Sequence, residues 1–193
     1  MNNKNLIFSK LLSLLLSIGM TFGSLSATAE ERLAFSALDN DVHAAIAYLL
    51  ETSPAAKKLA SSAKGALVFP SITKAGFIVG IQYGQGALVR ARQGGGYYIS
   101  DYYSIKSASY GLQAGVQSFG YVMALMTDAA VQHVETSQGW ELGVGPSIVV
   151  VDAGMAKTLS TETAKSDVYA FTFGQKGLMA GLGIQGSKIS KID

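Results

Sequence analysis

The fold is decided by residues 74–90, which read KAGFIVGIQYGQGALVR. Read with a period of two, one face of this stretch is bulky and apolar, and the other carries glycine at 80, 84 and 86. Because strand side chains alternate between the two faces of a sheet, the pattern predicts a strand. Glycine weakens strands, so its repetition on one face indicates a bend, a bulge or close approach of another backbone. Glycine pairs at 111/115, 143/145 and 181/183 predict several strands that share a crowded glycine side.

The first residues are typical of an export signal. Lys4 and Lys10 precede an apolar run over residues 11–22, which suits a signal peptide and is shorter than the roughly 20 residues that span a bilayer. Residues 27–29 read ATA, a small-x-small cleavage site. We expect residues 1–29 to be a cleaved signal peptide and residues 30–193 to form a single domain. The protein would then be exported, and periplasmic or peripheral to the bacterial envelope; an uncleaved membrane anchor is the alternative.

Charge and cysteine content exclude several classes of function. Removal of residues 1–29 takes away Lys4 and Lys10 and leaves thirteen basic and thirteen acidic residues. A formally neutral domain argues against nucleic acid as a partner. The chain has no cysteine, which excludes disulfides, thiolate chemistry and lipid attachment at a cysteine.

Helical patterns precede the strand patterns along the chain. Apolar residues form one helical stripe between Phe35 and Leu50, and Ser53-Pro54 predicts the start of a short helix that ends before Gly65. Period-two patterns then predict strands over residues 66–69, 74–90, 110–126, 140–151, 167–173 and 178–185, where 74–90 is either one long strand or a bent pair. A glycine turn is expected at 94–96, a short helix over 129–135 and a hairpin turn at 174–177. The order predicts an α+β fold, with a strongly curved antiparallel β-sheet or barrel-like core and N-terminal helices packed on it.

No catalytic or metal-binding pattern is recognisable. Residues 181–186 spell GxGxxG, but only seven residues follow, too few for the helix and acidic residue of a dinucleotide site. His43 and His133 have no metal-ligand spacing. We therefore expect no enzymatic activity, no cofactor and no metal. Five tyrosines between 97 and 110 are interpreted either as sheet packing or as a belt at a lipid interface.

Two blocks of sequence resemble the SYLF lipid-binding domain family. Residues 63–70 (AKGALVFP), 74–80 (KAGFIVG) and 84–90 (GQGALVR) resemble its opening segments, and residues 169–187 (YAFTFGQKGLMAGLGIQGS) resemble its closing segment. The similarity runs from about Ala37 to Ile189. The chain departs from the family where residues 97–101 replace a Trp-Ser-x-Pro segment, and where Ile184-Gln185-Gly186 replaces Leu-Glu-Gly.

The resemblance implies a non-enzymatic domain that binds membrane lipid. Eukaryotic members bind phosphoinositides or phosphatidic acid and some bind actin; for an exported bacterial protein only the lipid role transfers, with anionic phospholipid at a membrane surface as the ligand. The family's lipid contact involves an N-terminal amphipathic helix and basic residues. By position, the resemblance implies Lys57, Lys58, Lys64 and Lys74. The alternatives are an envelope-assembly protein that acts through homo-oligomer contacts and a small outer-membrane barrel.

Overall fold

The computed structural model describes residues 30–110, 115–137, 139–151, 165–177 and 186–192. The chain divides into two compact units, Met1–Leu38 and Asp39–Asp193. In the first unit, the described residues 30–38 are helical. The second unit contains all of the described strands.

Among the described residues, three helical segments belong to the second unit. Residues 39–52 are helical, α2 spans Pro54–Ala60 and α3 spans Asp128–Thr136. Ser53 caps α2 by accepting the Ala56 N–H, and Thr127 caps α3 by accepting the Ala130 N–H. These helices confirm the sequence prediction. Among the described residues, none of the helices has the length and apolar character needed to cross a bilayer.

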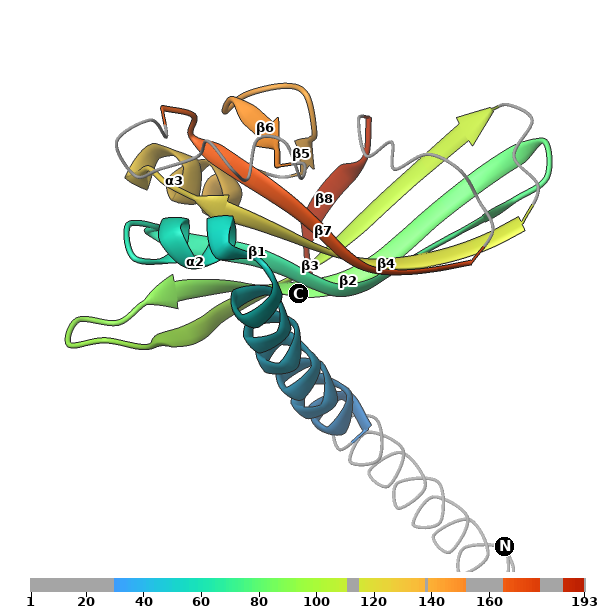
Figure 1. The fold of residues 1–193 in the computed structure, drawn as a ribbon. Coiled ribbons are helices and arrows are strands. Elements are labelled where there is room, and N and C mark those ends of the chain that lie inside the picture. The colour runs from blue at the N-terminus through green and yellow to red at the C-terminus, as the bar shows by residue number, and fades with distance from the viewer. Residues whose placement is uncertain (1–29, 111–114, 138, 152–164, 178–185, 193) are drawn as a thin grey trace, which may run out of the picture. The chain divides into compact units, whose positions relative to one another are not determined.

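The described strands form one sheet in the order β5-β8-β3-β2-β1-β4-β7-β6. Their bounds are β1 (Gly65–Gly76), β2 (Val79–Ala91), β3 (Tyr97–Tyr110), β4 (Gly115–Leu125), β5 (Trp140–Glu141), β6 (Ile148–Val150), β7 (Val168–Gly177) and β8 (Lys188–Lys191). Neighbours pair antiparallel except β6 and β7, which are parallel. The sheet curls strongly into a half-barrel with the N-terminal helices packed on it, which confirms the predicted α+β class (Figure 1).

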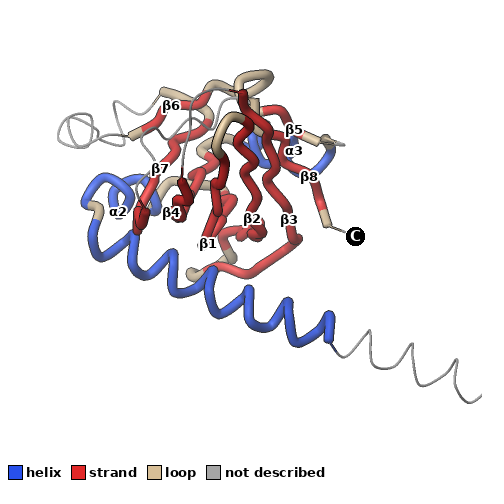
Figure 2. The backbone as a smooth tube through the Cα atoms, turned by 90° about the vertical axis from the view of Figure 1, so that its right-hand side faces the viewer, coloured by secondary structure: helices blue, strands red, loops and turns tan. Residues whose placement is uncertain are grey.

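The two faces of the sheet differ in what covers them. The core face carries the main hydrophobic cluster, in which large side chains such as Leu67, Phe69 and Met123 pack with Val131 and Val134 of α3. The opposite face, which we call the helix face, carries smaller residues that meet helical residues 39–52 and α2 (Figures 1 and 2). The helix face therefore accommodates backbone close to the sheet, while the core face supplies most of the buried volume.

The predicted alternation of β2 is confirmed, and the structure explains its glycines. Gly80, Gly84 and Gly86 are buried on the core face. A β-bulge in β1 between Val68 and Ser71 lies opposite, and a Cβ at Gly86 would lie 2.1 Å from the Val68 carbonyl oxygen. The backbone that closely approaches these glycines is therefore that of the neighbouring strand β1. The helices lie against the other face of β2.

Three predicted boundaries are wrong, and the strand β3 was not predicted. Of the two alternatives for residues 74–90, the structure has a pair of strands, the end of β1 and β2, joined by a turn at residues 77–78. The strand predicted to end at Pro70 continues to Gly76, because the bulge absorbs the proline. The strand predicted over 140–151 is two short strands, because Gly143 and Gly145 have φ of 110° and 102° and form a turn. The turn predicted at 174–177 belongs to β7. The strand predicted over 178–185 lies outside the described residues.

Candidate functional site

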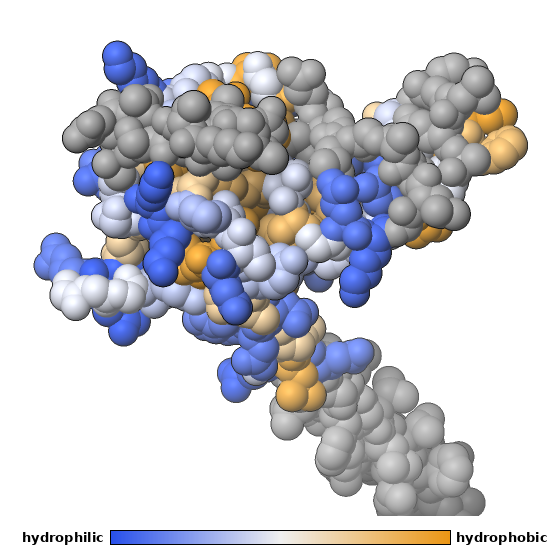
Figure 3. All heavy atoms as spheres, viewed as in Figure 1, coloured by the Kyte–Doolittle hydropathy of each residue, from blue (hydrophilic) through white to orange (hydrophobic). Residues whose placement is uncertain are grey.

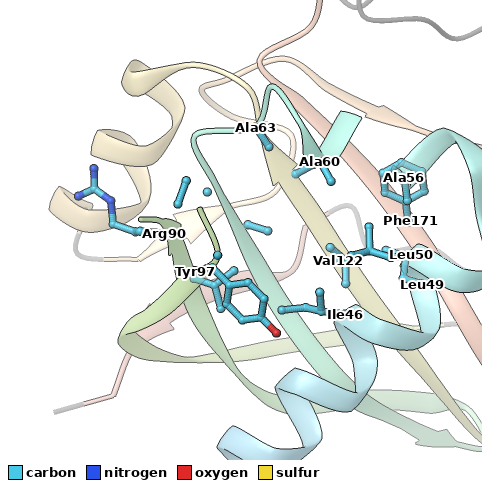
Figure 4. Close-up of a pocket in the computed structure, with 16 residues that line it drawn as sticks. Ile46, Leu49, Leu50, Ala56, Ala60, Ala63, Arg90, Tyr97, Val122 and Phe171 are labelled. Atoms are coloured by element: carbon cyan, nitrogen blue, oxygen red, sulfur yellow. The ribbon is translucent and has the colours of Figure 1, made fainter. Parts of the chain in front are cut away.

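A pocket of about 280 Å³ lies between the helix face and its helices. Helical residues 46–50, α2 and the segment after it, and strands β1, β2, β3, β4 and β7 supply its walls (Figure 4). The lining is almost entirely aliphatic, with Ile46, Leu49, Leu50, Val89, Val122 and Phe171 as its largest apolar members. A cavity of this kind suits an apolar ligand or part of one, since few polar groups are present to orient a hydrophilic molecule.

Polar side chains occur at the rim of this pocket. The Tyr97 hydroxyl lies 2.7 Å from His43 Nδ1, and burial raises the pKa of Tyr97. Arg90 lines the pocket with its stem, while its guanidinium points away toward α3 and binds Glu135 at 2.8 Å (Figure 4). The pocket therefore holds a tyrosine hydroxyl at its edge, and the charge of Arg90 is paired elsewhere.

A second tyrosine ties the N-terminal helix to β3. The Tyr102 hydroxyl donates to Asp39 Oδ1 at 2.8 Å. Burial, and then the hydrogen bond and negative charge of Asp39, raise the pKa of Tyr102 to about 12. Together with the His43–Tyr97 contact, this bond fixes the helix over the sheet and so defines one wall of the pocket.

Three of the four predicted lysines lie on one segment of the chain, and the fourth lies apart from them. Lys57 and Lys58 are exposed on α2, and Lys64 is exposed just before β1. Their sequence neighbours Ala56 and Ala63 line the pocket, so these ammonium groups belong to the segment that forms one pocket wall. Lys74 lies ten residues beyond Lys64, roughly 30 Å away along a strand of ordinary rise.

Lys74 also faces the other side of the sheet. It is half-buried and pairs with Gln82 of β2 and Gln117 of β4. Both glutamines are buried, and neither Oε1 atom has a hydrogen-bond partner. In the sheet register Lys74 lies between these two glutamines on the core face, apart from the three lysines at the pocket.

The two histidines have packing partners. His43 contacts Tyr97, and the His133 ring packs edge-on against Trp140 at 5.6 Å between centroids. In the part of the chain that the structure describes, no group of three His, Cys, Asp or Glu residues could hold a metal ion.

Two features escaped the sequence reading: the pocket, and an exposed apolar region on the helix face beyond it. The pocket is built mainly from alanines and scattered aliphatic residues that look like ordinary core positions in the sequence. The exposed region contains Phe77 and Ile78, which lie at a hairpin turn. Because such turns favour glycine, asparagine and aspartate, two large apolar residues there are the sequence signal that could have indicated an exposed apolar region.

The domain is thus a curled α+β sheet with helices on one face and an apolar pocket between them. Residues 106–193 match the family described as Ysc84: Las17-binding protein actin regulator. This is the SYLF family, a family of non-enzymatic binding domains, and the prediction of a SYLF domain is confirmed by these residues, which include the closing block at 169–187. No curated protein was found that matches the chain.

Proposed function

We propose that this protein is an exported, non-enzymatic lipid-binding protein that recognises anionic phospholipid at a membrane surface in the bacterial envelope. The observation that carries the proposal is the apolar pocket with three exposed lysines on the segment that forms its wall. An acyl chain is the apolar ligand that arrives attached to an anionic headgroup. The arrangement allows one molecule to satisfy both parts of the site.

The lysines contribute through their charge. Each Lys or Arg close to an anionic membrane surface contributes about 1 kcal/mol of attraction. Lys57, Lys58 and Lys64 are exposed, so their ammonium groups reach a phosphate without any rearrangement of the fold. Lys74 is not part of this proposal's contact surface, because it lies on the core face between Gln82 and Gln117.

Vesicle sedimentation tests the lysines. The processed protein, recovered after export, should pellet with vesicles containing phosphatidylglycerol more strongly than with neutral phosphatidylcholine vesicles. The Lys57→Glu/Lys58→Glu variant should bind the anionic vesicles at least tenfold more weakly, since the charge change exceeds the 1.4 kcal/mol that a tenfold change requires. The single variant Lys57→Glu is also compared with the control Lys165→Glu, which makes the same charge change at an exposed position outside the pocket wall. Equal loss in both variants would contradict the assigned lysines.

Native mass spectrometry tests the pocket separately. The protein purified without added lipid should carry a phospholipid mass. Ala60 lines the pocket yet is exposed, so Ala60→Phe should fill the cavity while leaving the unfolding transition unchanged. Retention of the same lipid by a folded Ala60→Phe variant would place that lipid elsewhere.

A further inference from the structure

The helix face continues past its helices into an exposed apolar region at the far end of the sheet. Val79, Ile81 and Tyr83 alternate along β2 on the same face as the covered residues Ala87 and Val89. Val116 of β4 joins Ile81 across Ala75 of β1 in one cross-strand row. We define the bare patch as the large exposed apolar residues at this end, namely Phe77, Ile78, Val79, Ile81, Tyr83 and Val116.

The bare patch is unusually exposed for side chains of its kind. Phe77 is 70% exposed, Ile81 63% and Val116 61%. Figure 3 shows orange, apolar surface at the end of the sheet where β1 turns into β2. A contiguous apolar patch of this sort marks an interaction surface, since single exposed apolar residues are common but clusters are not.

The hairpin that ends the patch departs from ordinary turn chemistry. Residues 77 and 78, at the turn between β1 and β2, are phenylalanine and isoleucine. Glycines stand at the base of the turn instead, where a Cβ on Gly76 would lie 2.5 Å from the Gly80 Cα. The glycines thus meet the steric demand of the tight hairpin, and the positions farthest from the body of the domain carry large apolar side chains.

The charged residues around the bare patch indicate which kind of partner it binds. Residues 71–85, 104–110, 115–119 and 175–177, which form this end of the five central strands, contain three lysines and no aspartate or glutamate. One cross-strand row runs from Lys106 through Tyr83, Thr73 and Ser118 to Lys176, with a lysine at each end. The Lys106 Nζ lies 5.8 Å from the Tyr83 ring centroid. An apolar tip backed by cations complements a bilayer with anionic headgroups.

The spacing along the strand agrees with insertion into one leaflet. Tyr83 is five residues behind Ile78, which places the lysine row roughly 15 Å behind the turn for an ordinary strand rise. Half of a bilayer's hydrocarbon core is also about 15 Å thick. With the turn among the acyl chains, tyrosine and the two lysines would lie at headgroup level, the depth that these residue types favour.

We propose that the β1–β2 hairpin inserts Phe77 and Ile78 into an anionic lipid bilayer, with Lys106 and Lys176 on the headgroups. This inference rests on the proposed lipid-binding function and adds a second, separate contact at the opposite end of β1 from Lys57 and Lys58. The hairpin is the membrane anchor, while the pocket holds an individual lipid.

A fluorescence experiment tests the hairpin directly. The chain has no cysteine, so Ile78→Cys can be labelled with one environment-sensitive dye, with Gln93→Cys as control on the β2–β3 turn. Phosphatidylglycerol vesicles should blue-shift the dye at 78 and expose it to quenchers on lipid acyl chains, with neither effect at 93. Vesicles that bind the protein without changing the dye at 78 would overturn the proposal.

Substitutions separate this inference from the function proposed above. Phe77→Ser/Ile78→Ser should weaken vesicle binding at least tenfold and leave the unfolding midpoint unchanged, because both side chains are exposed. Val150→Ser, which changes an exposed valine on β6, is the control and should change neither vesicle binding nor the unfolding midpoint. Binding that survives at the hairpin variant but is lost at Lys57→Glu/Lys58→Glu would keep the lipid function and reject the hairpin.

Two further outcomes also decide the question. If the wild-type protein ignores anionic vesicles, the hairpin proposal is overturned, and lipid retained in native mass spectra still decides the pocket. If the dye at 78 blue-shifts with protein concentration in the absence of vesicles, and light scattering shows a doubled mass, the patch binds a second copy of this chain instead of lipid.

Discussion

The two halves of the helix face have the same strand pattern and opposite surroundings. Along β2, Ala87 and Val89 are buried beneath the helices, whereas Val79 and Ile81 on the same face are exposed. The covered half of β2 carries Ala87 and Val89 beside a pocket, and the bare half carries Val79, Ile81 and Tyr83 and ends in an apolar hairpin. The same strand face therefore meets protein at one end and, in our proposal, lipid at the other.

The largest contrast between the halves should appear in stability. Leu59→Ala removes a fully buried side chain of α2 and should lower the free energy of unfolding by about 2–5 kcal/mol. Ile81→Ala removes an exposed side chain and should change it by no more than about 0.5 kcal/mol. Urea unfolding of the two variants measures the difference. Equal losses would mean that the bare half is buried in solution, as it would be in a stable oligomer.

Adding a single methyl group at Gly86, between the covered and bare halves of β2, should lower the stability of the protein. A Cβ at residue 86 would lie 2.1 Å from the Val68 carbonyl oxygen and 2.6 Å from the Phe69 ring. Gly86→Ala should therefore cost about 1–3 kcal/mol by overpacking against the β1 bulge. Gln85→Ala, at the exposed neighbouring position, is the matched control and should be nearly neutral. An unchanged free energy of unfolding in the Gly86→Ala variant would show that the β1 bulge shifts to accept the methyl group.

The smallest predicted effect concerns the attachment of the helix to the covered half. Tyr102→Phe removes the hydroxyl bonded to Asp39 and should cost about 1 kcal/mol at neutral pH. Because the pKa of Tyr102 is raised to about 12 in the folded state, its contribution is complete below pH 10 and is lost as pH rises from 10 toward 12.

The pH dependence provides the measurement. Burial also raises the pKa of Tyr103 and Tyr121, so the wild-type protein and the Tyr102→Phe variant should both lose stability in alkali. The difference between their unfolding free energies should shrink from pH 9 to pH 12, since only Tyr102 distinguishes them. A constant difference would assign the effect of the substitution to packing.

Local patterns predicted the described helices and much of β1, β2, β4 and β7, whereas β3 was not predicted as a strand. Ser53-Pro54 and Thr127 located two helix starts because capping depends on neighbouring residues. The break at Gly143 and Gly145 was missed because a glycine on a strand face and a glycine with positive φ read alike in a sequence. Pro70 was misread because the bulge that accommodates it depends on pairing with residues 85–87.

The site was predicted less well than the fold for the same physical reason. Lys57, Lys58 and Lys64 were chosen as neighbours in sequence, and one short exposed segment carries all three. Lys74 was grouped with them, but its environment is set by pairing with Gln82 and Gln117, which no local pattern reveals. The pocket needed five strands and two helical segments in place before its alanines acquired a shared role.

The ends of the described sheet limit how these molecules can associate. Its outermost strands, β5 and β6, have two and three residues, so each offers few free backbone groups to a strand from another molecule. Short edge strands protect a sheet against edge-to-edge aggregation. The short strands β5 and β6 therefore give a strand of another molecule little to extend.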